Sequence, residues 1–397
     1  MRSSDSFGEK KLEKIAFRWS SFGLLVFIFS FLWSPSRDGI QGLFALLFFL
    51  PVFFLLLTSG LRLKFYGGWA AFSALAFGGF SAFSTTWSKQ PDIAFQLIQL
   101  VTLTAWLCGA RLIFEKREVE LINYILWFVA LGSLTILLSV VYYFLFLYVP
   151  SYAEARFSGW NVFRNQNEVG AFSGILTLLS ITIALSADSK GKFYAFYFFS
   201  ACAATGLIAS FSRGALLAFV IMLAILIILY RPACARLFPL MLTFGLFVLC
   251  LFFLYPNAFD FGTRGYHIGL RSAIWSHVYE SFKTNQLVGI GLSKNTTISI
   301  EGMAYNHAHS AWLDTIYRTG IIGISLFLWH LRLVFKLKLS PAVEPLLFLW
   351  LGYGLLFNLF DGRCFFGELG AKWFFYWIPI GLIIAYGSSA TNKKIPS

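Results

Sequence analysis

The sequence predicts an all-α polytopic membrane protein, and three observations carry that prediction. Hydrophobic residues make up 58% of the 397 residues and charged residues only 12%, a composition far too apolar for a soluble domain of this size. Apolar runs of roughly 20 residues, each about long enough to cross a bilayer, recur along the whole chain. The basic residues gather mostly at one set of ends of these runs. We therefore expect residues 1–397 to form a single integral membrane domain.

About twelve apolar runs are candidates for membrane-spanning helices. The first run follows MRSSDSFGEKKLEK, is long, and lacks a small-residue cleavage site, so we interpret it as a span rather than a signal peptide. The predicted spans lie near residues 16–34, 40–58, 67–85, 93–113, 120–148, 169–186, 193–211, 214–231, 237–255, 309–331, 343–360 and 373–390.

Lysine and arginine predict the orientation of these spans. With twelve spans and a cytoplasmic N-terminus, most of the 31 basic residues fall on the cytoplasmic side, as the positive-inside rule requires. Both termini are then cytoplasmic. The net charge of +13 is mainly a signal of topology and needs no nucleic acid to explain it. The 5 cysteines show no paired spacing, so we expect no disulfide framework.

Two outer connections, 149–168 and 256–308, are longer than the others, and long ordered loops are often functional. In the second, Ile274, Val278 and Phe282 recur at helical spacing, which predicts an amphipathic helix lying on the membrane or capping a cavity. We expect residues 256–308 to form a loop subdomain of short helices. The abundant aromatic residues we interpret mainly as lipid-facing bulk and interfacial belts.

Six arginines predicted on the outer side stand apart, because a charge at the end of a span is costly near hydrocarbon. They are Arg156, Arg164, Arg213, Arg264, Arg271 and Arg363. Arg213 lies in SFSRGALLAF between two apolar helices, where Gly214 would let the backbone turn and approach closely. Its guanidinium could bind phosphate oxygens, or it could instead reach lipid headgroups or pair with Glu168. Together the arginines indicate an anionic ligand such as a lipid phosphate or diphosphate.

The segment RFSGWNVFRNQNEVGAF, residues 156–172, precedes a predicted span. Asn165, Gln166 and Asn167 can cap that helix, because short polar side chains accept hydrogen bonds from its free N–H groups. The start of the helix could also form an anion site together with Arg156 and Arg164. The two interpretations are compatible.

His307 and His309 form a His-x-His pair where the long loop meets an apolar helix. Zinc sites normally need at least three protein ligands, and no residue at a suitable spacing completes the set, so we expect no metal and no cofactor. His309 could be a capping or interfacial residue, or a general base that takes a proton from an attacking hydroxyl. We favour His309 over His307 as the base, because His309 lies at the start of the helix.

Within the same helix, Gly320 and Gly323 are spaced to permit close helix packing. Asp314 and Arg318 lie one turn apart and could pair with each other. Both features would fix the helix that carries His309.

Three motifs in order resemble the O-antigen ligase and polymerase superfamily of bacterial inner membranes. They are SRGALLAF, GIGLS at 289–293, and HSAWLDTIYRTGIIG at 309–323. The resemblance covers roughly residues 156–335, and STTWSKQPD at 84–92 is also similar. His-Ser followed by nine residues and Gly-x-x-Gly is typical of the ligase branch.

The resemblance implies a metal-independent, inverting glycosyltransferase with a GT-C-like fold in the inner membrane. The donor would be a polysaccharide on undecaprenyl diphosphate at the periplasmic face, and the acceptor a sugar of lipid A–core. His309 matches the proposed base. Arg213 and Arg271 match the positions that bind the diphosphate, with Arg156 and Arg264 as further phosphate contacts.

Other functions remain open. An O-antigen polymerase shares the fold and the donor, and a protein O-oligosaccharyltransferase differs in its acceptor. A transporter or flippase of lipid-linked glycan would instead carry ionisable residues at mid-membrane and inverted repeats. The charges here cluster at span ends, which favours an enzyme.

Overall fold

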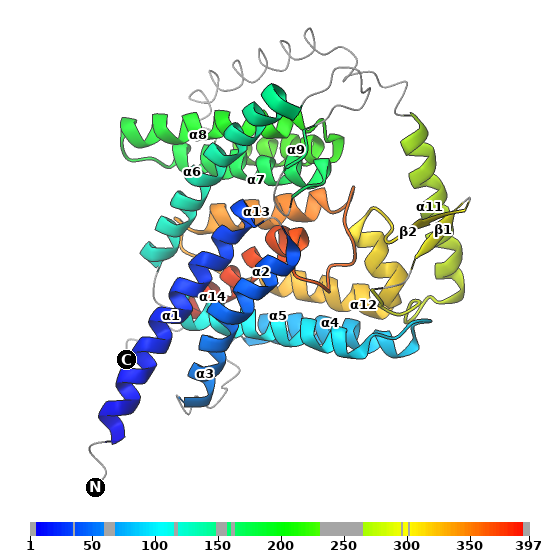
Figure 1. Cartoon of the computed structure of the whole chain (residues 1–397), viewed down its shortest axis with the longest axis horizontal. Helices are drawn as coiled ribbons and strands as arrows, with labels where there is room; N and C mark the ends of the chain where they lie inside the picture. The colour runs from blue at the N-terminus through cyan, green and yellow to red at the C-terminus, as the bar shows by residue number, and fades with distance from the viewer. Residues whose placement is uncertain are drawn as a thin grey trace.

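The computed structural model describes residues 5–34, 36–58, 68–114, 118–147, 157–159, 163–230, 265–294, 297–300 and 302–391. These residues form a helical bundle with one two-stranded sheet (Figure 1). The prediction of a helical membrane protein is therefore confirmed in its helical character, although a strand pair was not expected.

The elements follow one another in the order of the predicted apolar runs. They are α1 (Asp5–Trp33), α2 (Arg37–Leu43), η1 (Phe44–Phe49), α3 (Leu50–Thr58), α4 (Gly68–Phe83), η2 (Ser84–Trp87), α5 (Ile93–Phe114), α6 (Glu118–Tyr142), η3 (Tyr143–Leu147), α7 (Gln166–Leu185), α8 (Lys190–Ala209), α9 (Arg213–Leu229), α11 (Gly265–Thr284), β1 (Ile298–Ile300), β2 (Met303–Tyr305), α12 (Ala311–Phe335), α13 (Glu344–Phe357), η6 (Trp373–Trp377) and α14 (Ile378–Thr391).

Every predicted span falls on a helix except the one near 237–255, which lies outside the described residues. Among those residues, 6 helical stretches are long and apolar enough to cross a membrane. They are Arg37–Phe54, Ile93–Ile113, Val119–Leu147, Gln166–Leu185, Lys190–Ala209 and Ala311–Phe335. Four shorter apolar helices are Arg18–Trp33, Arg213–Leu229, Glu344–Phe357 and Trp373–Gly387. A multi-spanning protein fits these lengths, and the count of twelve and the GT-C-like fold stay predictions.

Every residue of helix α7 from Val169 to Leu185 is buried. In Figure 1 it lies among α6, α8 and α9 in the upper part of the molecule. It packs against α6, α8, α9 and α13, while α12 packs against α4 and α11. The core thus forms around a helix that is apolar on all sides, as expected for a span enclosed by other spans.

The aromatic residues are only partly on the outside, so their interpretation as lipid-facing bulk is partly wrong. Trp106, Trp373 and Trp377 are among the largest fully buried side chains. The Trp106 indole N–H donates to the carbonyl of Trp377 at 2.7 Å. A buried indole needs such a partner, and the π-helical turn η6 supplies carbonyls for it. Trp127, by contrast, is exposed.

The loop 256–308 contains the 20-residue α11 and an antiparallel hairpin in which Ile298 pairs with Tyr305. The expectation of short helices alone is therefore wrong. The predicted amphipathic helix is confirmed, because Ile274 and Val278 are buried against Ile298, Ala308 and Tyr317. This apolar face packs on the protein, so α11 caps the start of α12 at one edge of the molecule (Figure 1).

Candidate active site

Several helix ends meet at the turn that follows α13. The side chain of Asn167, in the first turn of α7, donates to Asp361 Oδ2 at 2.7 Å. Gly214, in α9, approaches Phe360 so closely that an added Cβ would lie 2.7 Å from its Cβ. The N–H of Ala311, which begins α12, donates to the carbonyl of Asp361 at 3.3 Å. The turn therefore joins the starts of three helices that are far apart in sequence.

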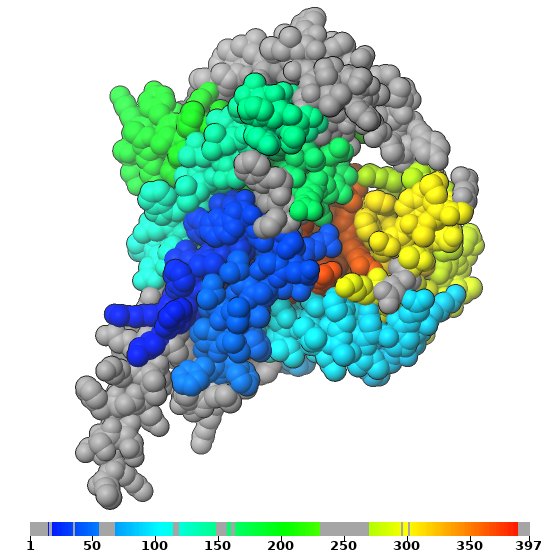
Figure 2. All heavy atoms as spheres, in the orientation of Figure 1, coloured from blue at the N-terminus to red at the C-terminus, as the bar shows by residue number. Residues whose placement is uncertain are grey.

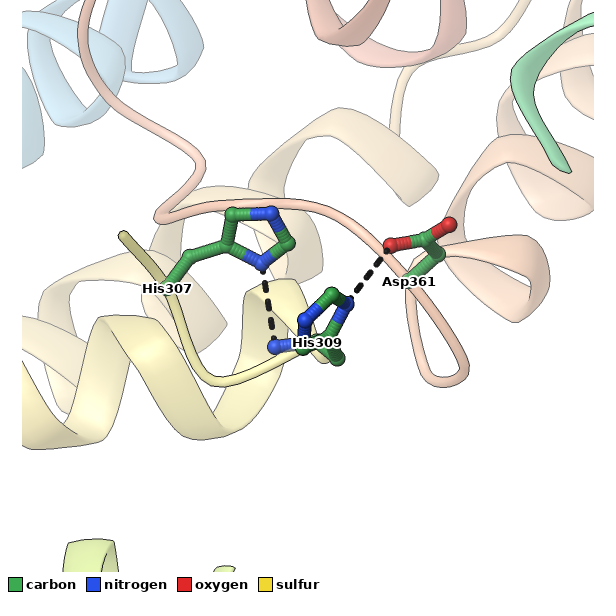
Figure 3. A group of neighbouring side chains, drawn as sticks. All are labelled: His307, His309 and Asp361. Atoms are coloured by element: carbon green, nitrogen blue, oxygen red, sulfur yellow. Dashed lines mark hydrogen bonds and ion pairs between the residues drawn. The ribbon is translucent and has the colours of Figure 1, made fainter. Parts of the chain in front are cut away.

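His309 lies at this junction, immediately before the N-cap residue of α12. Ser310 caps the helix by accepting from Leu313 N–H at 3.4 Å. His309 itself has φ 52°, a left-handed conformation that is uncommon for a residue with a Cβ. Its backbone N–H donates to His307 Nδ1 at 3.0 Å (Figure 3). Strained backbone of this kind persists where the surrounding structure enforces it, and such residues cluster at functional sites.

Asp361 faces His309 from the other side of the junction (Figure 3). His309 Nδ1 lies 3.6 Å from Asp361 Oδ1, which is long for a hydrogen bond, as pairs of this kind often are before a substrate is bound. The carboxylate also accepts from Asn167 and from Gly362 N–H. Burial opposes the charged form, but His309, Gly362 and Asn167 outweigh it and lower the pKa of Asp361 to about 2. A permanent negative charge therefore faces Nδ1.

His307 is held as a neutral ring. Burial, followed by the nearby His309, lowers the pKa of His307 to about 4. Because its Nδ1 accepts from the backbone of His309, its proton belongs on Nε2. The neighbouring chain is fixed by Trp275, whose indole donates to the carbonyl of Ala308 at 2.9 Å. His307 is therefore a neutral hydrogen-bond donor at this position.

His307, His309 and Asp361 together could hold a metal ion by position, since a donor atom of each lies within 4.8 Å of the others. The inference that nothing completes the His-x-His pair is thus wrong in space, because Asp361 lies beside it. His307 Nδ1 and both Asp361 carboxylate oxygens already accept hydrogen bonds, with lone pairs that such an ion would need. The absence of a metal from the site stays a prediction.

Gly320 has a different role from the close packing we predicted. It has φ 63° and interrupts α12, so the helix continues across a kink. The N–H groups that follow turn outward, and those of Ile321 and Ile322 donate to the carbonyls of Gln286 and Leu287. Only glycine adopts this conformation without strain, and a Cβ would meet the Leu287 carbonyl.

The GIGLS segment pairs with α12 beside this kink. Gly291 N–H donates to the Arg318 carbonyl at 3.0 Å, and Leu292 N–H to Ser84 Oγ at 3.0 Å. Gly289 and Gly291 both have positive φ, and a Cβ on Gly291 would lie 2.6 Å from the Ser84 carbonyl. Three motifs that are distant in sequence, at 84–92, 289–293 and 309–323, thus meet at one place.

Asp314 and Arg318 form the predicted pair, with Arg318 Nε 2.7 Å from Asp314 Oδ2 and both side chains fully buried. The other Arg318 nitrogens donate to the carbonyls of Ser293 and Asn306, each at 3.0 Å. Asp314 also accepts from Cys364 N–H at 2.8 Å. The pair therefore ties the GIGLS segment, the approach to His309 and the turn after α13 into one unit.

The predicted phosphate-binding arginines occupy different surroundings. Arg213 is the exposed first residue of α9, and Arg271 is half-buried in α11, one turn before the Trp275 that holds the His309 segment. Within the part of the chain that the structure describes, neither makes a hydrogen bond or ion pair, so the alternative pairing of Arg213 with Glu168 does not form. Arg156 and Arg264 lie outside the described residues.

Two neighbouring features of the sequence are explained by the structure. The turn before Arg213 is made by Phe211, which has φ 48°, and Gly214 serves only the close approach to Phe360. Asn165 caps α7 as predicted, because its side chain accepts from Asn167 N–H at 2.8 Å.

A cavity of about 640 Å³ lies beside the junction, and His307 and Asp361 form part of its wall. Figure 2 shows this face hollowed where the orange C-terminal segment appears between blue, cyan and yellow residues. Its size is within the usual range for a small-molecule site. Its basic lining residues are Arg37, Arg164, Lys294, Arg363 and Lys372, whereas Arg213 and Arg271 do not line it.

Sequence reasoning missed Asp361 entirely and noted Arg363 only as a charge on the outer side. The available signal was the polar run DGR at 361–363 in a connection between two apolar segments. Arg363 donates to the carbonyls of Ser293 and Lys294, so it closes the cavity wall beside the GIGLS segment.

One family model matches the chain. It is described as O-antigen ligase and covers residues 198–328, which include the start of α9, α11, the hairpin and His309. No curated protein matches the chain. The match over these residues supports the resemblance of this chain to the O-antigen ligase superfamily.

Proposed function

We propose that this chain belongs to the O-antigen ligase superfamily, which the family match supports, and that it is an O-antigen ligase of the bacterial inner membrane. It would transfer polysaccharide from undecaprenyl diphosphate to a hydroxyl of lipid A–core at the periplasmic face. The observation that carries the proposal is the His309–Asp361 pair at the junction of the family's motifs, beside a polar cavity.

His309 would act as the general base. With Nδ1 directed to Asp361, the proton of the neutral ring belongs on Nδ1 and Nε2 is free to accept. Asp361 is a positioning residue, since its fixed charge orients the imidazole and stabilises the imidazolium that forms. The acceptor oxygen attacks the anomeric carbon and gives its proton to His309. The bond from that carbon to the diphosphate breaks, and the configuration inverts.

Arg213 and Arg271 would bind the diphosphate and stabilise the charge that develops on it as it leaves. Their guanidinium groups have no partner among the described residues, so their donors are available for phosphate oxygens. Arg156 and Arg264 are proposed as further contacts on the strength of the resemblance. No metal, nucleotide or cofactor is required, because the lipid diphosphate is already an activated leaving group.

The first experiment is a gel of lipopolysaccharide from cells that lack the gene, with a probe for undecaprenyl-linked glycan. Long polymer accumulating on undecaprenyl diphosphate, with bare lipid A–core, is the expected result. Core carrying a single repeat unit, with no long polymer, would identify a polymerase instead. Unchanged lipopolysaccharide would exclude both and favour a protein O-oligosaccharyltransferase or a transporter.

A second experiment separates the enzyme from a transporter. Purified protein, supplied only with lipid-linked glycan and lipid A–core, is expected to form product without ATP or an ion gradient. Asp361→Asn should lower kcat more than it changes the KM of either substrate, because it weakens the orientation of His309 rather than binding. Asp188→Asn, at an exposed position that does not line the cavity, is the matched control for loss of one carboxylate.

A further inference from the structure

The peptide bond between Ala308 and His309 is held at both of its polar ends. Its carbonyl accepts the indole N–H of Trp275 at 2.9 Å, and its N–H donates to His307 Nδ1 at 3.0 Å (Figure 3). Rotation of this peptide plane about the N–Cα bond of His309 is what changes the φ angle of that residue. One side chain from α11 and one from the loop therefore hold His309 at φ 52°.

The backbone of His309 needs this support, because a left-handed conformation is unfavourable for a residue with a Cβ. Such a residue keeps its conformation only where the surrounding contacts enforce it. The φ angle also sets the direction in which the Cα–Cβ bond leaves the chain, and so decides whether the imidazole reaches Asp361. Release of either hydrogen bond would let His309 relax towards an ordinary conformation and would move its ring relative to Asp361.

Trp275 belongs to α11, which is anchored on the approach to α12. Ile274 and Val278 are buried in one apolar cluster with Ala308 and Tyr317. Trp275 is not part of that cluster and is 38% exposed, so packing alone does not account for an indole at this position. The specific contact of Trp275 is its hydrogen bond to the peptide that precedes His309.

The same helix carries Arg271, which is proposed above to bind the donor diphosphate. Arg271 lies four residues before Trp275, and residues four apart lie on one face of a helix. The N–H of Ala308 donates to Asp314 Oδ1 at 3.1 Å, so the other side of this residue is tied to α12. Ala308 therefore joins the helix of the base to the helix that carries a contact for the donor.

Resting on the proposed function, we infer that Trp275 is a positioning residue for the transfer reaction. Its indole N–H orients the peptide that precedes His309, and it thereby links the base to the helix that carries Arg271. Trp275 acts through His309 rather than on a substrate. Its loss should therefore lower the rate of transfer without weakening the binding of donor or acceptor.

The first test is Trp275→Phe, which keeps an aromatic ring and removes the indole N–H. We expect kcat to fall about 3- to 10-fold, the equivalent of one neutral hydrogen bond, with the KM of both substrates unchanged. Trp350→Phe is the matched control, because the Trp350 indole donates to the Phe374 carbonyl at 2.9 Å and does not line the cavity. The control should unfold at a lower temperature and keep its kcat. An unchanged kcat in Trp275→Phe, or an equal loss in both variants, would overturn the positioning role.

A double variant separates positioning of the base from a general loss of stability. Trp275→Phe and Asp361→Asn would both act by loosening the imidazole of His309. The loss of kcat in the double variant should therefore fall short of the product of the two separate losses by about 3-fold or more. Losses that multiply in full would show that Trp275 acts independently of His309, and would contradict the inference.

Nuclear magnetic resonance of the imidazole rings distinguishes failure of this inference from failure of the proposed reaction. The chain has 5 histidines, and comparison with His309→Ala identifies the signal of His309 in histidine-labelled protein. We expect Trp275→Phe, but not Trp350→Phe, to shift that signal.

The outcomes differ for the two ideas. An unshifted His309 signal together with normal transfer in Trp275→Phe would overturn the positioning role and leave the reaction standing. A shifted signal, in a protein whose wild-type form transfers nothing to lipid A–core, would overturn the reaction and support the orientation of His309 by Trp275. An unshifted signal without wild-type transfer would overturn both.

Discussion

Two groups of arginines in this protein are held in opposite ways. Arg318 is fully buried, and its guanidinium is engaged by Asp314 and by two backbone carbonyls. Arg213 and Arg271 make no hydrogen bond or ion pair with any residue that the structure describes. An arginine whose donors are all used contributes to the fold, whereas one whose donors are free can bind an anion. Sequence position alone does not separate the two groups.

His309 lies immediately before α12, whose start is fixed by the Asp314–Arg318 pair and the GIGLS segment. Arg213 begins α9, and Arg271 lies in α11. The Asp314–Arg318 pair and the GIGLS segment therefore fix the position of the base, whereas Arg213 and Arg271 are available to bind the ligand. The following predictions test this division.

The largest effect is expected at His309. His309→Ala should lower the transfer rate about 10²- to 10⁴-fold, the usual contribution of a general base, while the protein still inserts and folds. His309→Gly should be equally inactive yet no less stable, because glycine adopts φ 52° without strain. Single-turnover transfer and thermal unfolding in detergent measure the two effects. Substantial activity in either variant would remove His309 from the role of base.

Removing one partner of the Asp314–Arg318 pair should lower the free energy of unfolding more than the rate of transfer. Arg318→Met leaves the Asp314 carboxylate buried and unpaired, which should destabilise the protein by about 3–5 kcal/mol. The double variant Asp314→Ala, Arg318→Met should recover part of that loss, because no buried charge then remains. Arg213→Met is the contrast and should leave unfolding unchanged. Equal effects of Arg318→Met and Arg213→Met on unfolding would contradict the division between the two groups.

Replacing an arginine by lysine keeps the positive charge but removes the planar guanidinium, so it tests whether the free arginines bind phosphate through two nitrogens. Arg213→Lys and Arg271→Lys should each lower kcat/KM for the donor by roughly 10- to 100-fold, because a bidentate contact to phosphate is lost. Steady-state kinetics at varied donor concentration give the value, with Lys283→Gln as a surface control. Near-normal activity in both variants would argue against bidentate contact with the diphosphate.

The neutral ring of His307 makes the stability of the protein depend on pH. Its pKa is about 4 in the folded protein and 6.5 ordinarily, so the unfolded chain takes up the proton first as pH falls. Stability should therefore be complete above pH 6.5 and decline by roughly 2–3 kcal/mol between pH 6.5 and 4. Asp361, with its pKa of about 2 against an ordinary 3.8, adds a further loss only below pH 4. His307→Gln should flatten the upper part of this curve, and an unchanged slope in that variant would show that another group titrates.

The smallest effect is expected from removing metal. Because hydrogen bonds already engage His307 and Asp361, EDTA should leave the rate of transfer unchanged. The assay is run on purified protein before and after treatment with the chelator, and with zinc added back. Loss of activity that zinc restores would mean that His307, His309 and Asp361 hold an ion during the reaction.

Local features of the sequence were predicted well where neighbours in the chain determine them. The apolar runs became helices, Asn165 caps α7, and Ile274 and Val278 form the inner face of α11. The Asp314–Arg318 pair was also foreseen, because residues four apart on a helix face each other. The hairpin at 298–305 was missed, since its strands are only 3 residues long and too short for a clear pattern.

By itself, the sequence determined that this protein is a multi-spanning helical bundle with a histidine at the start of a helix after a long loop. Only the tertiary structure decided what surrounds that histidine. Asp361 follows His309 by many residues, and the partners of GIGLS lie in both earlier and later segments. Periodicity and capping depend on residues within a few positions of each other, whereas a contact between distant segments depends on how whole helices pack. For the same reason, only the structure could distinguish an arginine with saturated donors from one with free donors.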